Sequence, residues 1–102
     1  MTTRYVRSFL ELSVYQRAHE VSQAVFRLSK SFPKEQMYSL TDQIRRAARS
    51  AGAQISEAWG KRRYEKRFVS KLADADAEQM ETQHWVSEAL DWEYFTDAPA
   101  DE

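Results

Sequence analysis

Apolar residues recur near the helical period in the first third of the chain, from Leu12 to Phe32. They are Leu12, Tyr15, Val21, Val25, Leu28 and Phe32. Ser8 and Glu11 have the spacing of a capping box, in which each side chain satisfies a free backbone N–H at a helix start. Pro33 lacks an N–H and disfavours the helical conformation at Phe32. The pattern therefore predicts a helix over residues 9–31.

A second stripe of apolar residues, most of them alanines, runs through residues 40–60. It consists of Leu40, Ile44, Ala47, Ala48, Ala51, Ile55 and Ala58. Small side chains allow a neighbouring helix to approach closely, so we expect this helix to be the central one. Ser39 and Asp42 form a weaker capping signal. Gly52 marks a bend or a close crossing, and Gly60 is a plausible helix end.

A third helix is predicted over residues 64–90, with apolar residues on two lines. One line holds Phe68, Leu72, Ala75, Val86 and Leu90, and the other holds Val69, Ala73, Ala77 and Met80. A helix with two apolar lines usually has two neighbours. We expect residues 91–102, which are rich in acidic side chains, to fray.

The chain has 102 residues, which is the size of one domain. Only two Gly and two Pro occur, too few for the many turns of an all-β fold. Together with the three predicted helices, this composition indicates an all-α, antiparallel up-down helical bundle in a single domain, residues 1–102. The exposed side of the third helix and the aromatic residues near Trp85 and Trp92 favour oligomerisation, which would cover them.

Charge is divided sharply along the sequence. Residues 1–71 hold all fifteen Lys and Arg and six acidic residues, whereas residues 72–102 hold ten acidic residues and no basic one. The net charge of −1 thus conceals a strongly polarised chain. Such polarity points either to nucleic acid as a partner for the basic part or to another copy of the chain as a partner for both parts.

Several classes of function find no support in the residues. There is no Cys and no apolar run of about 20 residues, so thiolate sites and a membrane span are excluded. The start of the chain lacks the apolar stretch of a secretory signal, which makes a cytoplasmic protein the expectation. His19 and His84 are single, and no catalytic triad or glycine-rich phosphate loop occurs.

The acidic residues of the third helix scatter over different sides of it, so no metal site is expected. They are Asp74, Asp76, Glu78 and Glu81. We therefore predict no enzyme activity, no cofactor, no metal and no small-molecule substrate.

A polar line runs beside the alanine stripe of the second helix. Gln43, Ser50 and Glu57 are spaced by seven residues and share one face, and Arg46 and Gln54 fall close to the same line. The favoured interpretation is a structural network in which Arg46 or Gln54 bonds with acidic residues of the third helix. The acidic candidates are Asp76, Glu78 and Glu81. The alternative is a binding pocket at a subunit junction.

Basic residues are densest at the turn between the second and third helices, with two more on the second helix. They are Lys61, Arg62, Arg63, Lys66, Arg67 and Lys71, together with Arg45 and Arg49. Tyr64 and Phe68 lie among them. Basic residues with interleaved aromatic rings suit a nucleic-acid backbone and its bases. A solvated face, or salt bridges to the acidic part of a neighbouring subunit, is the alternative interpretation, because the sequence pI is only about 6.1.

Three segments of the second helix and the turn after it form a recognisable pattern. They run from Gln43 to Ser50, from Gln54 to Ala58, and over Gly60-Lys61. Phe32-Pro33 with Glu35, and Glu81-Thr82-Gln83, belong to the same pattern. It resembles the bacterial family of ribosomal-RNA intervening-sequence proteins, also called four helix bundle proteins, over about residues 9–95. The accessory protein of diversity-generating retroelements is a relative of that family.

This resemblance implies a small antiparallel bundle that assembles into a homo-oligomer, typically a five-fold ring. It also implies a role in binding structured RNA or other nucleic acid, with no known catalysis. The chain ends where the family's fourth helix should begin, so we expect that helix to be short or missing.

The leading hypothesis is a non-enzymatic, homo-oligomeric binder of structured RNA that acts through the eight basic residues named above. The alternative is a scaffold protein whose basic and acidic parts pair between subunits, without nucleic acid.

Overall fold

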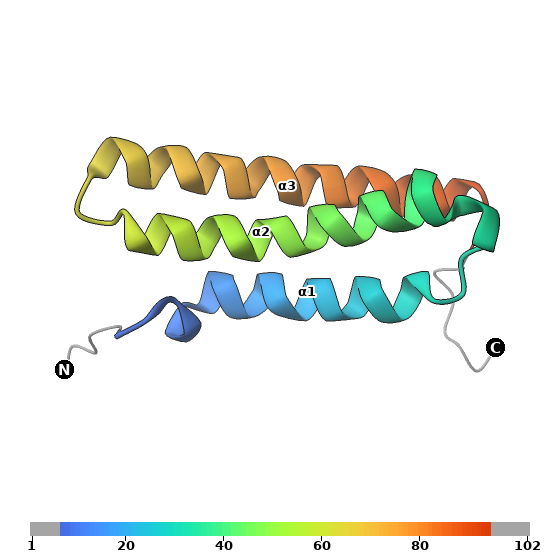
Figure 1. Cartoon of the computed structure of the whole chain (residues 1–102), viewed down its shortest axis with the longest axis horizontal. Coiled ribbons are helices and arrows are strands. Elements are labelled where there is room, and N and C mark those ends of the chain that lie inside the picture. Colours follow the sequence, from blue (N-terminus) through green and yellow to red (C-terminus); the bar gives the residue numbers. More distant parts are fainter. Residues whose placement is uncertain (1–6, 95–102) are drawn as a thin grey trace.

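Three long helices, each antiparallel to the next, form the part of the chain that the computed structural model describes, residues 7–94 (Figure 1). They are α1 (Ser13–Ser29), α2 (Asp42–Gly60) and α3 (Glu65–Asp91). No strand and no fourth long helix occurs within that range. The predicted all-α, up-down bundle is confirmed.

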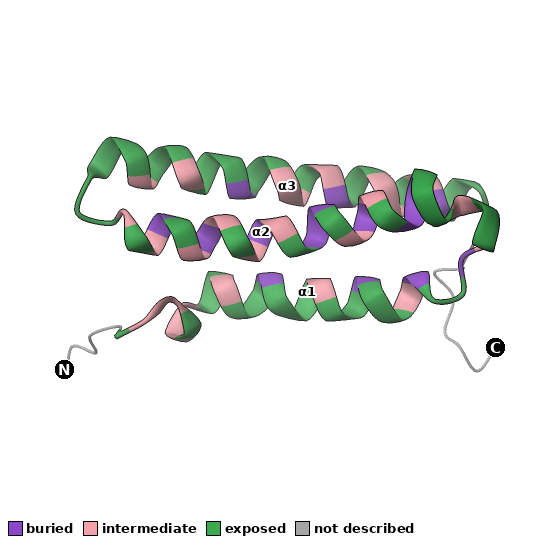
Figure 2. Ribbon diagram, in the orientation of Figure 1, coloured by how far each residue is buried: buried purple, intermediate pink, exposed green. Residues whose placement is uncertain are grey.

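The alanine stripe of α2 is the centre of the fold, as its small side chains predicted. Ile44, Ala47 and Ala51 are all 0% exposed. Every other member of the stripe is buried too, namely Leu40, Ala48, Ile55 and Ala58. Figure 2 shows buried bands along the length of α2, whereas α3 is mostly exposed.

The helices form a flat layer rather than a rounded bundle. α2 packs against both α1 and α3, and among residues 7–94 the backbones of α1 and α3 are closer to α2 than to each other. The molecule measures 46 × 30 × 17 Å, whereas one helix is about 10–12 Å wide. Side chains of α1 and α3 meet over the buried stripe of α2, and the opposite face of α2 is open to solvent or to a partner.

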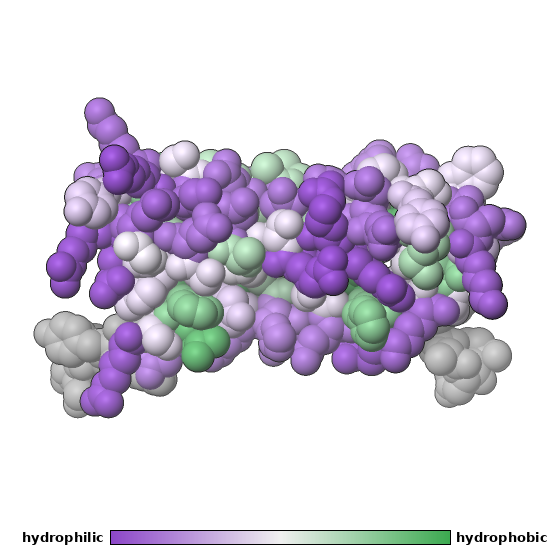
Figure 3. Space-filling view, viewed as in Figure 1, coloured by the Kyte–Doolittle hydropathy of each residue, from purple (hydrophilic) through white to green (hydrophobic). Residues whose placement is uncertain are grey.

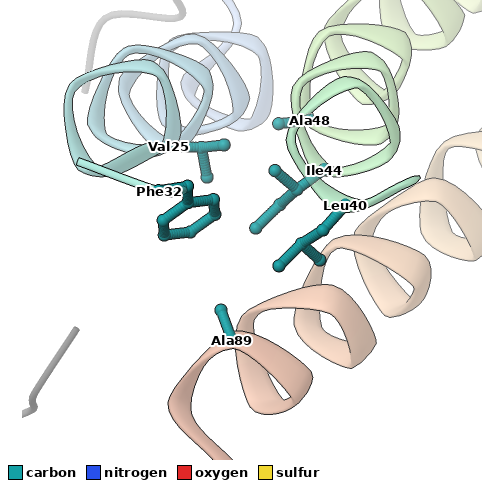
Figure 4. Packing of buried hydrophobic residues seen from close by; sticks show 6 residues of the cluster. All are labelled: Val25, Phe32, Leu40, Ile44, Ala48 and Ala89. Atoms are coloured by element: carbon teal, nitrogen blue, oxygen red, sulfur yellow. The ribbon is translucent and has the colours of Figure 1, made fainter. Parts of the chain in front are cut away.

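The larger of two hydrophobic clusters lies at the end of the layer where α1 leads into α2. Figure 4 shows its members converging from three directions, with Phe32 following α1 and Ala89 coming from α3. The cluster consists of Val25, Phe32, Leu40, Ile44, Ala48 and Ala89. Burying a side chain such as Ile44 contributes about 1.5–3 kcal/mol, so this cluster supplies much of the hydrophobic stabilisation.

A second, thinner cluster lies nearer the start of α1. It consists of Ala18, Ala51, Ile55 and Ala75, with Leu12 and Tyr15 packed against it. Because three of its four buried members are alanines, it removes little apolar surface from water.

The first helix begins later than the sequence predicts. Ser8 does cap a helical start, since its Oγ accepts a hydrogen bond from the backbone N–H of Leu10 at 3.2 Å. The helix that it caps, however, is only a single 3₁₀ turn, Phe9–Glu11. Glu11 accepts from the N–H of Arg7 at 2.7 Å. Leu12 then adopts an extended conformation and packs on the second cluster. The helix α1 follows from Ser13 and ends at Ser29, before Pro33.

The start of α2 also differs from the prediction. Ser39 does not cap the helix, because the chain is already helical from Lys34 through the short turns Lys34–Gln36 and Met37–Thr41. Its hydroxyl instead donates to the side-chain oxygen of Gln36 at 2.7 Å. At the other end, α2 stops at Gly60 as predicted.

The end of α3 is closed by two backbone hydrogen bonds. The N–H of Tyr94 bonds to the carbonyl of Ala89, and that of Glu93 to the carbonyl of Leu90, each at 3.0 Å. Glu93 has a φ of 60°, the left-handed conformation that this type of cap requires. Tyr94 then packs against Phe32, with ring centroids 5.8 Å apart. The rest of the segment predicted to fray, residues 95–102, lies outside the described residues.

One of the two apolar lines predicted for α3 has no neighbour in the described chain. Val69 is 55% exposed and Met80 is 62% exposed, and Ala73 and Ala77 between them are exposed as well. Only the line that includes Ala75 faces α2. Within residues 7–94 the line that includes Ala75 meets side chains of both α2 and α1, whereas the line from Val69 to Met80 stays exposed.

Gly52 marks no break in α2, which continues through it. A methyl group added at this position would lie 3.6 Å from a ring carbon of Tyr15, an ordinary van der Waals distance. Because glycine costs a helix interior more backbone entropy than alanine, we expect Gly52→Ala to raise the free energy of unfolding by about 0.5–1 kcal/mol. Urea denaturation followed by circular dichroism measures this change. A loss of stability would mean that α1 and α2 approach more closely here than the structure has them.

Candidate nucleic-acid interface

Arg46 links α2 to α3 on the polar side of the layer. Its Nη2 donates to the side-chain oxygen of Gln43 at 2.9 Å and lies 3.4 Å from Oε2 of Glu81. The same Glu81 oxygen accepts a hydrogen bond from the indole N–H of Trp85 at 3.0 Å. Glu78 is not part of this group, and its buried Oε2 has no hydrogen-bond partner among the described residues.

Lys71 holds a second polar group together, closer to the α2–α3 turn. Its Nζ lies 2.8 Å from Oε2 of Glu57, 3.3 Å from the side-chain oxygen of Gln54 and 3.9 Å from a carboxylate oxygen of Asp74. The hydrogen bond from Lys71 lowers the pKa of Glu57, and the same bond raises the pKa of Lys71.

The residues predicted to form one network are therefore divided. Gln43, Arg46 and Glu81 meet in the first group, and Gln54 and Glu57 meet in the second, where both bind a lysine from the predicted basic set. Ser50 is half-buried with no side-chain bond to another described residue, and Asp76 is exposed beside a groove between α1 and α3.

The α2–α3 turn carries the densest group of cations, which we call the basic tip, residues 61–71. Figure 3 shows this end of the molecule covered by hydrophilic residues whose long side chains project outward. Arg62 lies over the ring of Trp59, with its guanidinium carbon 4.2 Å from the centroid, and it donates to the carbonyl of Trp59 at 2.9 Å. Arg67 lies over the ring of Tyr64 at 5.4 Å.

A hollow of about 220 Å³ opens in the surface of the basic tip. It is lined by four cations and one hydroxyl group, belonging to Lys61, Lys66, Arg67, Lys71 and Ser70. Opposing carboxylates are few here, since Lys71 alone of these cations forms an ion pair within the described part of the chain. Such a hollow has the charge and the donors to hold an anion.

Arg45 and Arg49 lie apart from the basic tip. At a rise of about 1.5 Å per residue, Arg49 is roughly 18 Å along α2 from Lys61, and Arg45 is farther still. The Nε of Arg45 donates to the hydroxyl of Ser29 at 2.7 Å, and its guanidinium lies 4.6 Å from the ring centroid of Phe26. Arg45 thus braces α1 against α2, whereas Arg49 remains exposed.

Sequence reasoning did not find Trp59 or Ser70. Trp59 lies three positions before Arg62, and its ring and carbonyl both contact the Arg62 guanidinium. Side chains three positions apart lie close together on a helix. That spacing is the signal in the sequence that could have pointed to Trp59. Ser70 joins the hollow because it lies one turn after Lys66 on α3.

Neither histidine lies in a metal-binding arrangement in the described chain. His19 stacks on Tyr15, with centroids 6.2 Å apart, and His84 lies 4.0 Å from Glu88. Within residues 7–94 no three His, Asp or Glu side chains converge so as to hold a metal ion. None of the helices described there combines the length and the apolar character that a membrane crossing requires.

Comparison with known proteins gives one match. The family model described as 23S rRNA-intervening sequence protein matches residues 10–102. No curated protein and no solved structure matches the chain.

The Glu57–Lys71 ion pair predicts a small pH dependence of stability. Because the pKa of Glu57 is lowered, the pair stabilises the fold above the ordinary carboxyl pKa of about 4.3, and the effect is lost as pH falls through the lowered value. Because the pKa of Lys71 is raised, the effect persists below about pH 10.4 and is lost as pH rises through the raised value. Glu57→Gln should therefore be less stable than wild type at neutral pH and equally stable in acid.

Urea denaturation at about pH 7 and about pH 3 measures the free energy of unfolding of both proteins under the two conditions. Glu20→Gln is the matched control, since Glu20 is exposed and forms no ion pair within the described residues. The assignment is contradicted if Glu57→Gln and Glu20→Gln change stability equally at both values of pH.

Proposed function

Because the chain belongs to the 23S rRNA-intervening sequence protein family, we propose that it binds structured RNA and catalyses no reaction. The basic tip is the proposed contact surface. Its cations would neutralise phosphates of the RNA backbone, which is the dominant source of affinity for a polyanion. An RNA target also fits action in the cytoplasm.

The single observation that carries this proposal is that, within residues 7–94, the cations of the basic tip other than Lys71 form no ion pair with an acidic residue. Of the eight proposed binding residues, Lys71 alone forms an ion pair within residues 7–94. The antiparallel pairing of α2 and α3 explains why. Glu81 faces Arg46 and Lys71 faces Glu57, so the acidic residues that follow Lys71 lie alongside earlier turns of α2, away from the tip.

The exposed cations of the tip are the strongest candidates for phosphate contacts. They are Arg62, Arg63, Lys66 and Arg67, and half-buried Lys61 lies beside them in the hollow. Arg49 is exposed on α2 and could extend the surface along the layer. Lys71 and Arg45 already have partners within the chain, so their proposed role is to shape the surface rather than to supply most of the affinity.

A homo-oligomer is the proposed form of the protein, because the core of one chain is small. Seven of the twelve buried hydrophobic residues within the described range are alanines. Between α1 and α3 runs a groove of about 480 Å³ lined partly by Val14, Ile55 and Leu72. A helix from a second copy would fill this groove and give α1 and α3 a second common neighbour besides α2. The resemblance implies five copies.

The scaffold hypothesis is favoured by one feature of α3. From Asp74 onward α3 carries six acidic residues and no basic one, whereas the basic tip lies at its beginning, so a head-to-tail contact could pair them between copies. This contact would use the same cations that RNA would use. The two functions therefore predict different outcomes for charge reversal at the tip.

RNA affinity should fall steeply with salt if the tip contacts phosphates. For about five contacts, affinity should drop by a factor of about 100 to about 500 between about 50 and about 200 mM monovalent salt. Fluorescence anisotropy with a labelled stem-loop RNA measures this slope. A flat response, or no binding at the lower salt concentration, would remove the proposed function.

Charge reversal at the tip should abolish RNA binding while leaving assembly intact. The test is Lys66→Glu with Arg67→Glu. Its control is Arg27→Glu with Lys34→Glu, which makes the same change in net charge on exposed residues far from the tip. Anisotropy and light scattering are measured on both variants. If the tip variant dissociates into single chains and the control does not, the scaffold hypothesis replaces RNA binding.

A charge placed in the α1–α3 groove should prevent assembly without unfolding the chain. Val14 is 56% exposed and lines the groove, so Val14→Glu should lower the mass measured by light scattering and keep the helical circular dichroism spectrum. Tyr38→Glu, at a residue that is 85% exposed outside the groove, is the control and should assemble normally. Unchanged assembly of Val14→Glu would show that the groove is not an interface between copies.

A further inference from the structure

The cationic hollow of the basic tip is suited to a phosphate group. Lys61 comes from the end of α2, whereas Lys66, Arg67 and Ser70 come from the first turns of α3, so the donors converge from two elements. The Nζ of Lys71 lies 2.8 Å from the Glu57 carboxylate, and this ion pair fixes the position of Lys71 at the edge of the hollow. The nearby N-terminus of α3 has no side-chain cap, and the partial positive charge there favours an anion as well.

An exposed aromatic ring lies directly beside the hollow. Tyr64 is 61% exposed, and Arg67 both lines the hollow and lies 5.4 Å above the Tyr64 ring. No other aromatic ring stacks on Tyr64 among the described residues. Arg67 covers one face of the Tyr64 ring, and most of Tyr64 is exposed. The other face of this ring can therefore accept a flat group.

We propose that the basic tip binds an unpaired nucleotide, with a phosphate in the hollow and the adjacent base stacked on Tyr64; this inference rests on the proposed RNA-binding function. Arg67 joins the two parts of the site, because its guanidinium contributes charge to the hollow and lies over the ring. A base inside a helical stem is stacked between its neighbours and offers no free face. The site therefore selects the loops, bulges or ends of a structured RNA.

The ring and the hollow make separate contributions that substitution can distinguish. Tyr64→Leu removes the stacking surface, whereas Tyr64→Phe keeps it. Tyr64 supplies no side-chain cap to α3, so neither change removes a structural hydrogen bond of the helix start. Lys66→Gln removes one cation from the hollow and leaves the ring in place.

The test compares three ligands of equal length: a single-stranded oligouridine, an abasic strand with the same phosphates, and a duplex RNA. Wild type should bind the oligouridine about fivefold to about a hundredfold more tightly than the abasic strand. Tyr64→Phe should keep this preference. Tyr64→Leu should lose it while binding the abasic strand as wild type does, and Lys66→Gln should weaken both single strands by a similar factor.

Two results would overturn the inference, and they have different meanings. If wild type binds the oligouridine and the abasic strand equally, or if Tyr64→Leu keeps the preference, the stacking site is wrong and RNA binding through phosphates stands. If wild type binds none of the three ligands at low salt, the proposed function and this inference both fail.

Discussion

The fold depends on the close packing of the alanine stripe of α2 between its two neighbours. Alanines at buried positions such as Ala47, Ala51 and Ala58 allow both α1 and α3 to approach the same central helix closely. This arrangement buries the stripe almost completely, and side chains of α1 and α3 meet over it in the two clusters. The flat layer, the thin second cluster and the open groove between α1 and α3 all follow from it.

The same packing sets the electrostatic pattern of the molecule. Since α3 runs back along α2, its acidic residues lie beside the body of α2, where Glu81 pairs with Arg46. Most of the cations in the turn that joins the two helices remain exposed. The cations at the turn are thus held apart from most acidic residues of α3, whereas Arg46 on the body of α2 pairs with one of them. An end that is cationic, aromatic and hollowed is the part of this molecule best suited to a polyanion.

Much of the fold was predictable from spacing alone, because helical periodicity and helix-breaking residues are local signals. The stripe from Leu40 to Ala58 and the end of α2 at Gly60 are examples. The interruption of the first helix at Leu12 was not predictable. There a tertiary contact, the packing of Leu12 on the second cluster, outweighs a local capping signal.

The candidate site was predictable in composition but not in detail. The density of Lys and Arg identified the tip, yet nothing in the sequence separates Lys71, which faces Glu57, from Lys66, which remains exposed. That difference depends on the register in which α2 and α3 pack. Likewise, only the placement of α1 shows that Arg45 braces Phe26 and Ser29 rather than facing outward.

The most direct test of the central claim is an NMR titration of isotope-labelled protein with a stem-loop RNA, followed through the backbone amide signals. The account predicts that the largest shifts fall in residues 59–71, around the α2–α3 turn, and that the acidic later half of α3 changes little. Shifts concentrated at the opposite end of the layer, or no shifts at low salt, would contradict it.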